Sequence, residues 1–351
     1  MKDAFNQTYL LQVLEELLIT PSPSGYCHQI MEKIKKMVSH LGYSMEYTQK
    51  GCGVITIPGA KSDYTLGLSA HVDTLGAMVR SIKSSGTIRF TPIGGYMMSS
   101  IEGEYCTIHT RNGKKILGTI LPIQPSVHVY ADAKNLERNE SNMEIRLDEA
   151  VSSKEDVENL GIAVGDFISF DSRTVLLNNG FIKSRHLDDK AGVAILLGLL
   201  EWLHRTGIKP QYTLKVFISV YEEIGHGASY IPNDIQELIA IDMGAMGDDL
   251  TCTEQDVSIC VKDSSGPYDY HMISHLQSLA KENNLSYALD VYPYYGSDVS
   301  AALRGGQNIR GALIGPGVHA SHGIERTHIN GMLNTLALLS AYIQNGAPTI
   351  V

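Results

Sequence analysis

The sequence predicts an α/β fold, with a three-layer domain holding a mixed sheet between helices and a small β-barrel inserted into it. Helix and strand patterns alternate up to about Thr74 and again after residue 172. Between these stretches, residues 76–172 carry almost only strand signals. Alternating patterns on both sides of a β-rich insertion indicate one divided domain. We therefore expect residues 1–75 and 173–351, which also contain all the candidate site residues described below, to form one domain and residues 76–172 to form the inserted domain.

The N-terminal segment predicts two helices followed by two strands. Pro21 and Pro23 end the first helix, and Gly42 is the expected C-cap of the second. Apolar runs at Gly53–Ile57 and Leu66–Ala70 then indicate strands. The helices themselves are predicted by apolar residues at helical spacing: Phe5, Tyr9, Leu10, Val13, Leu14, Leu17 and Leu18 in the first, and Ile30, Ile34, Met37, Val38 and Leu41 in the second.

The insertion contains two turn signals. Arg111-Asn112-Gly113-Lys114 lies between the β-rich runs Tyr105–Thr110 and Lys115–Leu121. An Asn-Gly pair supplies the positive φ angles of a tight hairpin turn. Ser84-Ser85-Gly86 marks a second expected hairpin. Mainly strand signals over this length fit a small β-barrel or sandwich.

The remaining chain returns to an α/β pattern. Lys190–His204 is apolar on nearly every side, which predicts a buried helix. Leu214–Val220 and Glu237–Ile241 are apolar runs suited to a parallel sheet covered on both faces. Tyr268–Lys281 and Met332–Ile343 are expected to be amphipathic helices.

Charge and cysteine content narrow the function classes. The chain has 28 basic and 38 acidic residues, a net charge of -10, which disfavours binding to nucleic acid or anionic lipid. No apolar run is long enough to span a membrane, and the N-terminal segment is unlike a signal peptide, so a cytoplasmic location is expected. The five cysteines are scattered without a CxxC pair, which indicates neither disulfides nor a thiolate zinc site.

Two segments place candidate ligands beside apolar elements. His71 and Asp73 are two residues apart, so in a strand they share a face. Asp73 would then orient the imidazole, although a polar strand end is the commoner explanation of such a pair. Asp188 and Asp189 open the predicted buried helix. Either could cap that helix, but Asp188 is the better candidate to bridge two cations and Asp189 the better cap.

Two further segments place carboxylates at strand ends. Glu222 and Glu223 follow the strand that ends at Val220, and adjacent carboxylates there repel each other unless a cation or a proton intervenes. One of them could bind a metal while the other transfers protons for an attacking water. The alternative is a solvated acidic turn. Asp242 closes another apolar strand, at the edge where α/β sheets bind ligands.

A histidine-rich loop completes the set. Residues 318–325 include His319 and His322. One of these histidines would complete a set of two imidazoles, with His71, and three carboxylates, one each from the aspartate pair, the glutamate pair and Asp242. Nitrogen and oxygen ligands without thiolate suit zinc, cobalt or manganese. A shared carboxylate fits two cations about 3.5–4 Å apart.

The sequence resembles the glutamyl-aminopeptidase and tetrahedral (TET) aminopeptidase family of two-metal peptidases, which includes deblocking aminopeptidases. The resemblance covers essentially the whole chain and rests on the segments AHVDT, LDDKAG, VYEEIG, AIDMG, YGSD and SHGIERTH. It implies a PDZ-like β insertion used in assembly and often a hollow dodecamer. The site residues that it implies are His71, Asp188, Glu223, Asp242 and His322 as ligands of two divalent metal ions, Asp73 as the residue that orients His71, and Glu222 as the general base.

The resemblance also implies that Asp188 bridges the metals, through a cis peptide to Asp189. His319 remains an alternative last ligand. One departure concerns the loop after the glutamate pair. Many family members have EExGxxGA, whereas residues 222–228 read EEIGHGA and are one residue shorter, which changes the loop beside the metals.

The expected activity is that of a metal-dependent aminopeptidase acting on peptides. Zinc or cobalt are the expected metals, manganese is possible, and the protein is expected to form a homo-oligomer. The alternatives are a deacylase, a carboxypeptidase, a relative labelled as an endoglucanase, and a non-catalytic scaffold that kept the fold. The preferred N-terminal residue does not follow from the sequence.

Overall fold

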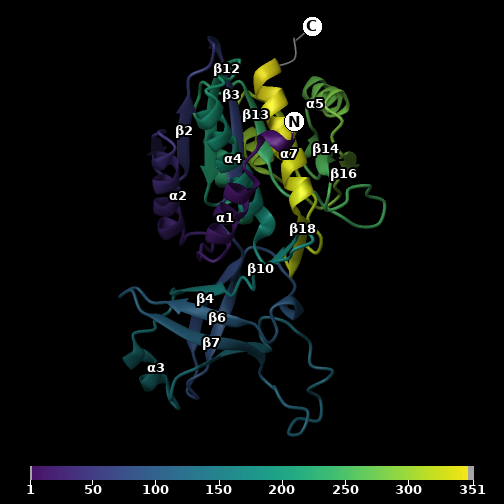
Figure 1. Cartoon of the computed structure of the whole chain (residues 1–351). Coiled ribbons are helices and arrows are strands. Elements are labelled where there is room, and N and C mark those ends of the chain that lie inside the picture. The colour runs from purple at the N-terminus through teal and green to yellow at the C-terminus, as the bar shows by residue number, and fades with distance from the viewer. Residues whose placement is uncertain (1, 347–351) are drawn as a thin grey trace.

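The computed structural model describes residues 2–346, which form two parts with separate hydrophobic cores. Figure 1 shows a large sheet with its helices above a smaller β-structure. The core of the smaller part draws its buried residues from Ala77 to Phe170. Both parts of the predicted fold class, the mixed α/β sheet and the small barrel, are confirmed.

The larger part is built on a nine-stranded sheet within the described residues. Its strands, in spatial order, are β1 (Met45–Tyr47), β2 (Gly53–Ile57), β12 (Tyr212–Ser219), β3 (Lys61–His71), β13 (Glu237–Ile241), β17 (Arg310–Pro316), β14 (Val257–Asp263) and β15 (Gly266–Pro267), with β16 (Tyr287–Val291) beside β14. The neighbours β12, β3, β13 and β17 run parallel, whereas β2 and β14 are antiparallel to their neighbours β12 and β17. The sheet is therefore mixed.

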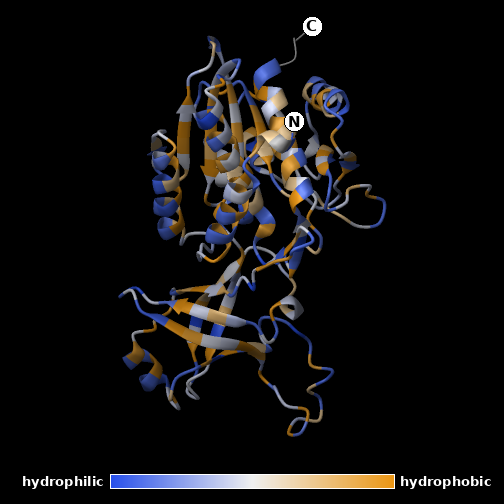
Figure 2. Cartoon of the chain, viewed as in Figure 1, coloured by the Kyte–Doolittle hydropathy of each residue, from blue (hydrophilic) through white to orange (hydrophobic). Residues whose placement is uncertain are grey.

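Helices cover the sheet. They are α1 (Gln7–Leu18), α2 (His28–His40), α4 (Leu187–Thr206), α5 (Tyr270–Glu282), α6 (Asp298–Arg304) and α7 (Ile329–Asn345), with short 3-10 turns η1 (Lys2–Ala4), η3 (Glu222–Ile224) and η4 (Gly227–Ser229). Helix α4 contacts α1, α7 and strand β3, and α6 contacts β13 and β17. All five residues of β13 are buried, and because alternate side chains point to opposite faces, both faces of the sheet are covered there. Figure 2 shows the sheet strands largely hydrophobic and a hydrophilic outer side on α2.

The smaller part is a closed antiparallel barrel of six strands. In order around the barrel they are β4 (Gly76–Ile82), β5 (Ile88–Ile93), β8 (Met143–Leu147), β7 (Lys115–Pro122), β6 (Tyr105–His109) and β9 (Phe167–Phe170). One helix, α3 (Lys154–Leu160), and one 3-10 turn, η2 (Met98–Ser100), lie between these strands. A small sheet of β10 (Val175–Leu176), β11 (Phe181–Ser184) and β18 (Glu325–His328) follows the barrel in the larger part.

Both predicted hairpins of the barrel are present, but the turn at Asn112 differs from the expectation. Gly113 has a φ of 83°, whereas Asn112 does not take a positive φ. Thr110 closes a longer loop, because its backbone N–H donates to the Lys114 carbonyl and its hydroxyl accepts from the Lys114 N–H. The asparagine therefore serves through its side-chain oxygen, which accepts from the Thr110 hydroxyl.

Other predictions can be compared element by element. The helix predicted at Lys190–His204 is the regular part of α4, whose residues from Leu187 to Leu203 are all buried. Gly42 follows α2 with a φ of 79°, as a residue that ends a helix does. The five cysteines are free and buried. Within residues 2–346, no helix has the combination of length and apolar character that crossing a membrane requires.

Candidate metal centre

The sheet brings the ends of three parallel strands together at one edge. Strands β12, β3 and β13 are neighbours, so residues at their carboxyl ends meet there. His71 is the last residue of β3, Asp242 directly follows β13, and the η3 turn with Glu222 and Glu223 follows β12. The start of α4 supplies Asp188, and the loop between β17 and β18 supplies His322. The structure thus collects six of the sequence-predicted candidates at one place: His71, Asp188, Glu222, Glu223, Asp242 and His322.

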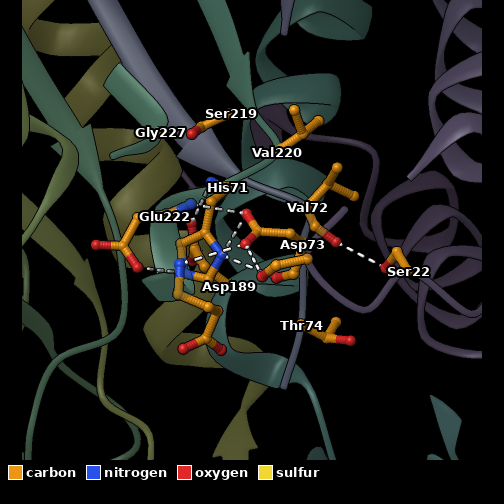
Figure 3. Close-up of polar contacts among 12 residues, drawn as sticks. Ser22, His71, Val72, Asp73, Thr74, Asp189, Ser219, Val220, Glu222 and Gly227 are labelled. Atoms are coloured by element: carbon orange, nitrogen blue, oxygen red, sulfur yellow. Dashed lines mark hydrogen bonds and ion pairs between the residues drawn. The ribbon is translucent and has the colours of Figure 1, made fainter. Parts of the chain in front are cut away.

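His71 is surrounded by carboxylates from three different elements. Its Nε2 lies 3.1 Å from Asp188 Oδ1, 3.7 Å from Glu222 Oε2 and 4.0 Å from Asp242 Oδ2. Figure 3 shows the imidazole of His71 between Glu222 on one side and Asp73 on the other. The imidazole and the Asp188 side chain are almost completely buried.

His322 forms the second half of the cluster. Its Nε2 lies 3.4 Å from Asp188 Oδ2 and 3.4 Å from Glu223 Oε2. The two oxygens of Asp188 therefore face different histidines. Glu222 and Glu223 likewise approach different histidines, as expected of neighbours in a tight turn. His319 is exposed, and among the residues that the structure describes its hydrogen bonds are those of its backbone with Arg326, so the structure brings His322 and not His319 to the cluster.

Asp73 contacts both His71 and the turn that carries Glu222 and Glu223. Its backbone carbonyl lies 3.0 Å from His71 Nδ1, and its carboxylate lies 3.7 Å from the same atom. The carboxylate also accepts the backbone N–H groups of Glu222 at 3.1 Å and Glu223 at 3.2 Å, and the hydroxyl of Ser24. Asp73 therefore orients the imidazole mainly through its backbone, and its carboxylate fixes the turn that carries both glutamates.

Asp189 lies beside the cluster, but both of its oxygens already have backbone partners. Oδ2 accepts the N–H of His71 at 3.2 Å and Oδ1 accepts the N–H of Gly192 at 3.1 Å. The second contact, three residues along the chain, caps the regular part of α4. The peptide between Asp188 and Asp189 is cis, as the family resemblance implied. Although Asp189 stands within ligand distance of His71 and Asp242, its contacts favour the predicted capping role.

Sequence reasoning missed several residues that position the centre. Glu325 accepts the backbone N–H of Asp188 at 3.1 Å and that of His322 at 3.0 Å, so one buried carboxylate joins two candidate ligands. Gly95, in the inserted barrel part, accepts a hydrogen bond from His322 Nδ1 through its carbonyl. That bond places the proton of the ring on Nδ1 and leaves Nε2 free to face the cluster. Glu325 lies in the SHGIERTH segment, which could have marked it, whereas no sequence pattern marks Gly95.

The shortened loop after the glutamate pair is fixed by two side chains. Asp298, the last residue of the YGSD segment, accepts the N–H of Ala228 at 3.0 Å and the hydroxyl of Ser219 at 3.2 Å. Lys50 donates to the Gly227 carbonyl at 2.9 Å and to Ser229 Oγ at 3.0 Å. The position of Lys50, far away in sequence, gave no signal of this contact.

The cluster carries more negative charge than its own histidines neutralise. Burial disfavours a charged His71, but the hydrogen bond with Asp188 and the charges of Glu222 and Asp242 outweigh it and hold the pKa of His71 well above its usual value. His322 behaves in the same way beside Asp188 and Glu223, with a pKa raised to about 10. Such histidines would hold protons at neutral pH.

Three of the carboxyl groups have a raised pKa, whereas the hydrogen bonds with His322 and His71 lower that of Asp188 despite its burial. Burial is the main cause that raises the pKa of Glu222 and Glu223 well above the ordinary range, and neighbouring carboxylates add to it. Burial and the charge of Asp188 raise the pKa of Asp242 to about 7. A cation at the centre would replace these protons and remove the repulsion.

The donor geometry fits divalent cations. Two ligand atoms that are each about 2.1 Å from a tetrahedral ion lie about 3.4 Å apart. The contacts of the histidine nitrogens with Asp188 and Glu223 span 3.1–3.4 Å. Glu223 Oε1 is buried and has no hydrogen-bond partner among the described residues. A buried oxygen without a partner is expected where the atom is a metal ligand. Imidazole and carboxylate donors without thiolate are also the set expected for zinc, cobalt or manganese.

An open cavity of about 420 Å³ adjoins the cluster, which a substrate could enter. It is lined by Asp188, Glu222, Glu223, Gly225, Asp242, Met243, Tyr294, Tyr295, Gly296, Ser297, Ala301, Arg304, Ser321 and His322. The candidate ligands thus form one wall of a space accessible from solvent.

Comparison with known proteins identifies the family. The model of the M42 glutamyl aminopeptidase family matches residues 51–338. The protein YhfE of Bacillus subtilis (strain 168) is 49% identical over 336 residues, which cover 95% of this chain and 97% of that relative. Aminopeptidase APDkam598 from the archaeon Desulfurococcus kamchatkensis has a similar fold, with a TM-score of 0.88, 23% identity and coverage of 97% of this chain and 96% of its own. The TET1 peptidase of Pyrococcus horikoshii gives a TM-score of 0.84 at 22% identity, covering 95% of this chain and 99% of its own.

The fold and the matches define a peptide hydrolase with an α/β catalytic part and an inserted barrel. The chain belongs to the M42 glutamyl aminopeptidase family. The family resemblance read from the sequence motifs is thereby confirmed.

Proposed function

We propose that the chain removes N-terminal residues from peptides with two divalent cations held by His71, Asp188, Glu223, Asp242 and His322. The observation that carries this proposal is the position of Asp188, whose two oxygens face His71 and His322 at 3.1 and 3.4 Å. A carboxylate between two separate imidazoles is what a bridged pair of ions needs. Zinc or cobalt suit the donors best, and manganese is compatible.

The pair of cations, when bound, would polarise the scissile carbonyl and lower the pKa of the attacking water. Glu222 accepts the proton of that water and passes it to the leaving amine. Its carboxylate lines the cavity, and its side chain is 16% exposed, the most accessible of the four cavity carboxylates. Asp73 contributes by positioning, since it holds the backbone of the glutamate turn and one face of His71.

The inserted domain, residues 76–172, serves assembly and substrate access in this proposal. The TET1 peptidase of Pyrococcus horikoshii assembles into a tetrahedron or a large octahedral shell, and a related structure is described as a dodecamer. We infer that this chain also forms a homo-oligomer beyond a dimer. Exposed apolar side chains on the barrel and its long loop, among them Tyr105, Leu117 and Val129, support contacts of this part with other copies.

Metal removal tests the proposed function. Dialysis against a chelator should abolish the release of p-nitroaniline from aminoacyl-p-nitroanilides, and zinc, cobalt or manganese should restore it. Circular dichroism and light scattering of the dialysed sample would show that fold and assembly survive. Full activity in a sample shown by mass spectrometry to be metal-free would overturn the mechanism.

Substrate choice separates the remaining possibilities. A glycosidase, the label that one structurally similar protein carries, would release reducing sugar from a glucan. A deacylase or a carboxypeptidase would instead cleave acylated amino acids or C-terminal residues. A scaffold that kept the fold would bind metal without turning over any member of a peptide library. We expect cleavage from free N-termini alone.

A further inference from the structure

A buried arginine joins the inserted barrel to the loop that carries His322. Arg185 lies between β11 and α4, and its side chain is 4% exposed. Its Nη1 donates to the carbonyl of Gly323, which directly follows His322, at 3.3 Å. Its Nη2 donates to the Ser100 carbonyl and lies 3.1 Å from Glu104 Oε1. Both of these partners belong to the barrel segment between β5 and β6, so one guanidinium contacts both parts of the molecule.

The loop between β17 and β18 is held by contacts from outside it. Ala320 and His322 both have a positive φ, 57° and 64°, which non-glycine residues rarely adopt. Such a backbone persists where its surroundings hold it in place. The His322 carbonyl accepts from the Ser100 hydroxyl at 3.5 Å, and the Gly323 carbonyl accepts from Arg185. The barrel segment and the arginine therefore hold two successive carbonyls of this loop.

The two halves of the candidate centre differ in how they are held. His71 ends β3 and Asp242 follows β13, so the central sheet fixes this sheet half. In the loop half, His322 faces Glu223 at 3.4 Å and belongs to the loop that Arg185 contacts. Within residues 2–346, the hydrogen bonds and the ion pair of the Arg185 side chain involve neither residue of the sheet half. Loss of the guanidinium should therefore affect the loop half alone.

Stability by itself does not account for an arginine at this position. Arg185 Nε and Glu104 Oε2 are buried and have no hydrogen-bond partner among the described residues. Because desolvation offsets the attraction in a buried ion pair, apolar residues of similar volume often serve folding equally well. The planar guanidinium differs from them in geometry, since its two Nη atoms donate at once to the carbonyls of Gly323 and Ser100. Neither an apolar side chain nor the single Nζ of a lysine reproduces that fork.

We propose that Arg185 is a positioning residue for the loop half of the candidate metal centre, where its guanidinium holds the His322 loop against the barrel segment and thereby sets the affinity for one of the two ions. This inference rests on the proposed two-metal function. It also gives the barrel a role within a single chain, because the position of the segment that contains Ser100 and Glu104 then controls how tightly one ion binds.

A cobalt titration of the metal-free protein tests the inference, followed by calorimetry and by the visible absorption of bound Co²⁺. The wild type should bind two ions. In Arg185→Gln one ion should bind as in the wild type, and the affinity for the other should fall at least about tenfold, since groups that orient a metal ligand contribute about 10- to 100-fold. Arg185→Lys keeps the charge beside Glu104 but cannot donate to two carbonyls in one plane, so it should restore only part of this affinity.

Arg173→Gln is the matched control. Arg173 Nη1 lies 3.0 Å from the same Glu104 oxygen, but its side chain is 53% exposed, and among the described residues it makes no hydrogen bond to the His322 loop. The variant removes a charge from the same carboxylate without releasing the loop, so both ions should bind as in the wild type. An equal loss of one ion in Arg173→Gln and Arg185→Gln would assign the effect to the charge of Glu104 and overturn the positioning role.

The outcomes separate this inference from the proposed function. If the wild type binds a single ion, or binds two without cleaving any aminoacyl substrate, the proposed function is wrong and the inference falls with it. If the wild type binds two ions and cleaves such substrates, but Arg185→Gln binds both ions as tightly or loses both to the same degree, the inference alone is wrong. Gel filtration and circular dichroism would show that each metal-free variant is folded. Arg185→Met, which keeps most of the volume without a donor, should lose the same ion and decides the case if the glutamine variant does not fold.

Discussion

Glu222 and Glu223 are neighbours for which the proposed mechanism gives opposite outcomes on substitution by glutamine. The amide keeps the shape of each side chain but removes its charge. At position 222 the fold-supporting contact is the backbone N–H that Asp73 accepts, and glutamine keeps it. At position 223 the side chain is 4% exposed and its Oε2 faces His322 at 3.4 Å. An amide there replaces a candidate ligand.

The magnitudes follow from these different surroundings. Glu222→Gln should lower kcat by roughly 10²- to 10⁴-fold, the usual contribution of a positioned acid-base group, at unchanged metal content. That equals about 3–5 kcal/mol of transition-state stabilisation. Glu223→Gln should weaken metal binding by at least about 100-fold, since even groups that only orient a ligand contribute about 10- to 100-fold. Its activity should therefore recover in part when metal is added in excess.

The assay pairs mass-spectrometric metal analysis after gel filtration with steady-state kinetics across a metal titration. Glu282→Gln, an exposed residue at the end of α5, is the matched control and should match the wild type in both measurements. If Glu222→Gln loses metal while Glu223→Gln keeps two ions without turnover, the two roles are reversed. If both variants remain nearly fully active, the turn is only a solvated acidic loop.

Two further predictions concern protons and assembly. Because the ion-free centre holds protons, on His322 up to a pKa of about 10 and on Asp242 up to about 7, metal binding must displace them. Apparent metal affinity should therefore rise as the pH rises from 6 towards 9. Calorimetry in buffers of different ionisation enthalpy would measure the protons released. An affinity independent of pH would contradict the assigned ligands. Multi-angle light scattering should show a species larger than a dimer at micromolar concentration, and a monomer would refute the assembly role of residues 76–172.

The strand ends were predictable because periodicity and local chemistry coincide there. The run Glu237–Ile241 is apolar at every position apart from its first residue, which identifies a covered strand, and Asp242 follows directly. The same reasoning placed His71 and the glutamate pair. If the strands are parallel neighbours, their carboxyl ends meet at one edge of the sheet, so the closeness of these residues could be predicted. The order of the strands in the sheet was not predicted, since strand pairing depends on contacts between distant segments.

The contacts that the sequence did not reveal act across long separations. Glu325 binds the N–H of Asp188, 137 positions away, and Lys50 binds carbonyls about 176 positions away. Glu325 does lie in the SHGIERTH segment, but nothing local predicts that it contacts Asp188, and Lys50 belongs to no motif. The turn at Asn112 shows a different limit. The hairpin was predictable from composition, but whether one or two residues take a positive φ depends on the hydroxyl of Thr110.

The point at which the barrel is inserted explains why it contributes to the centre. Strand β4 begins at Gly76, three residues after Asp73, so the chain enters the barrel directly from the candidate site. In the segment between β5 and β6, the Gly95 carbonyl accepts from His322 Nδ1 and the Ser100 carbonyl accepts from Arg185. This hydrogen bond places the proton of His322 on Nδ1 and turns Nε2 towards the cluster, and a partner on the second ring nitrogen is usual for a metal-bound histidine. Because the barrel part supplies that partner, the barrel is part of the structure that shapes the candidate metal centre.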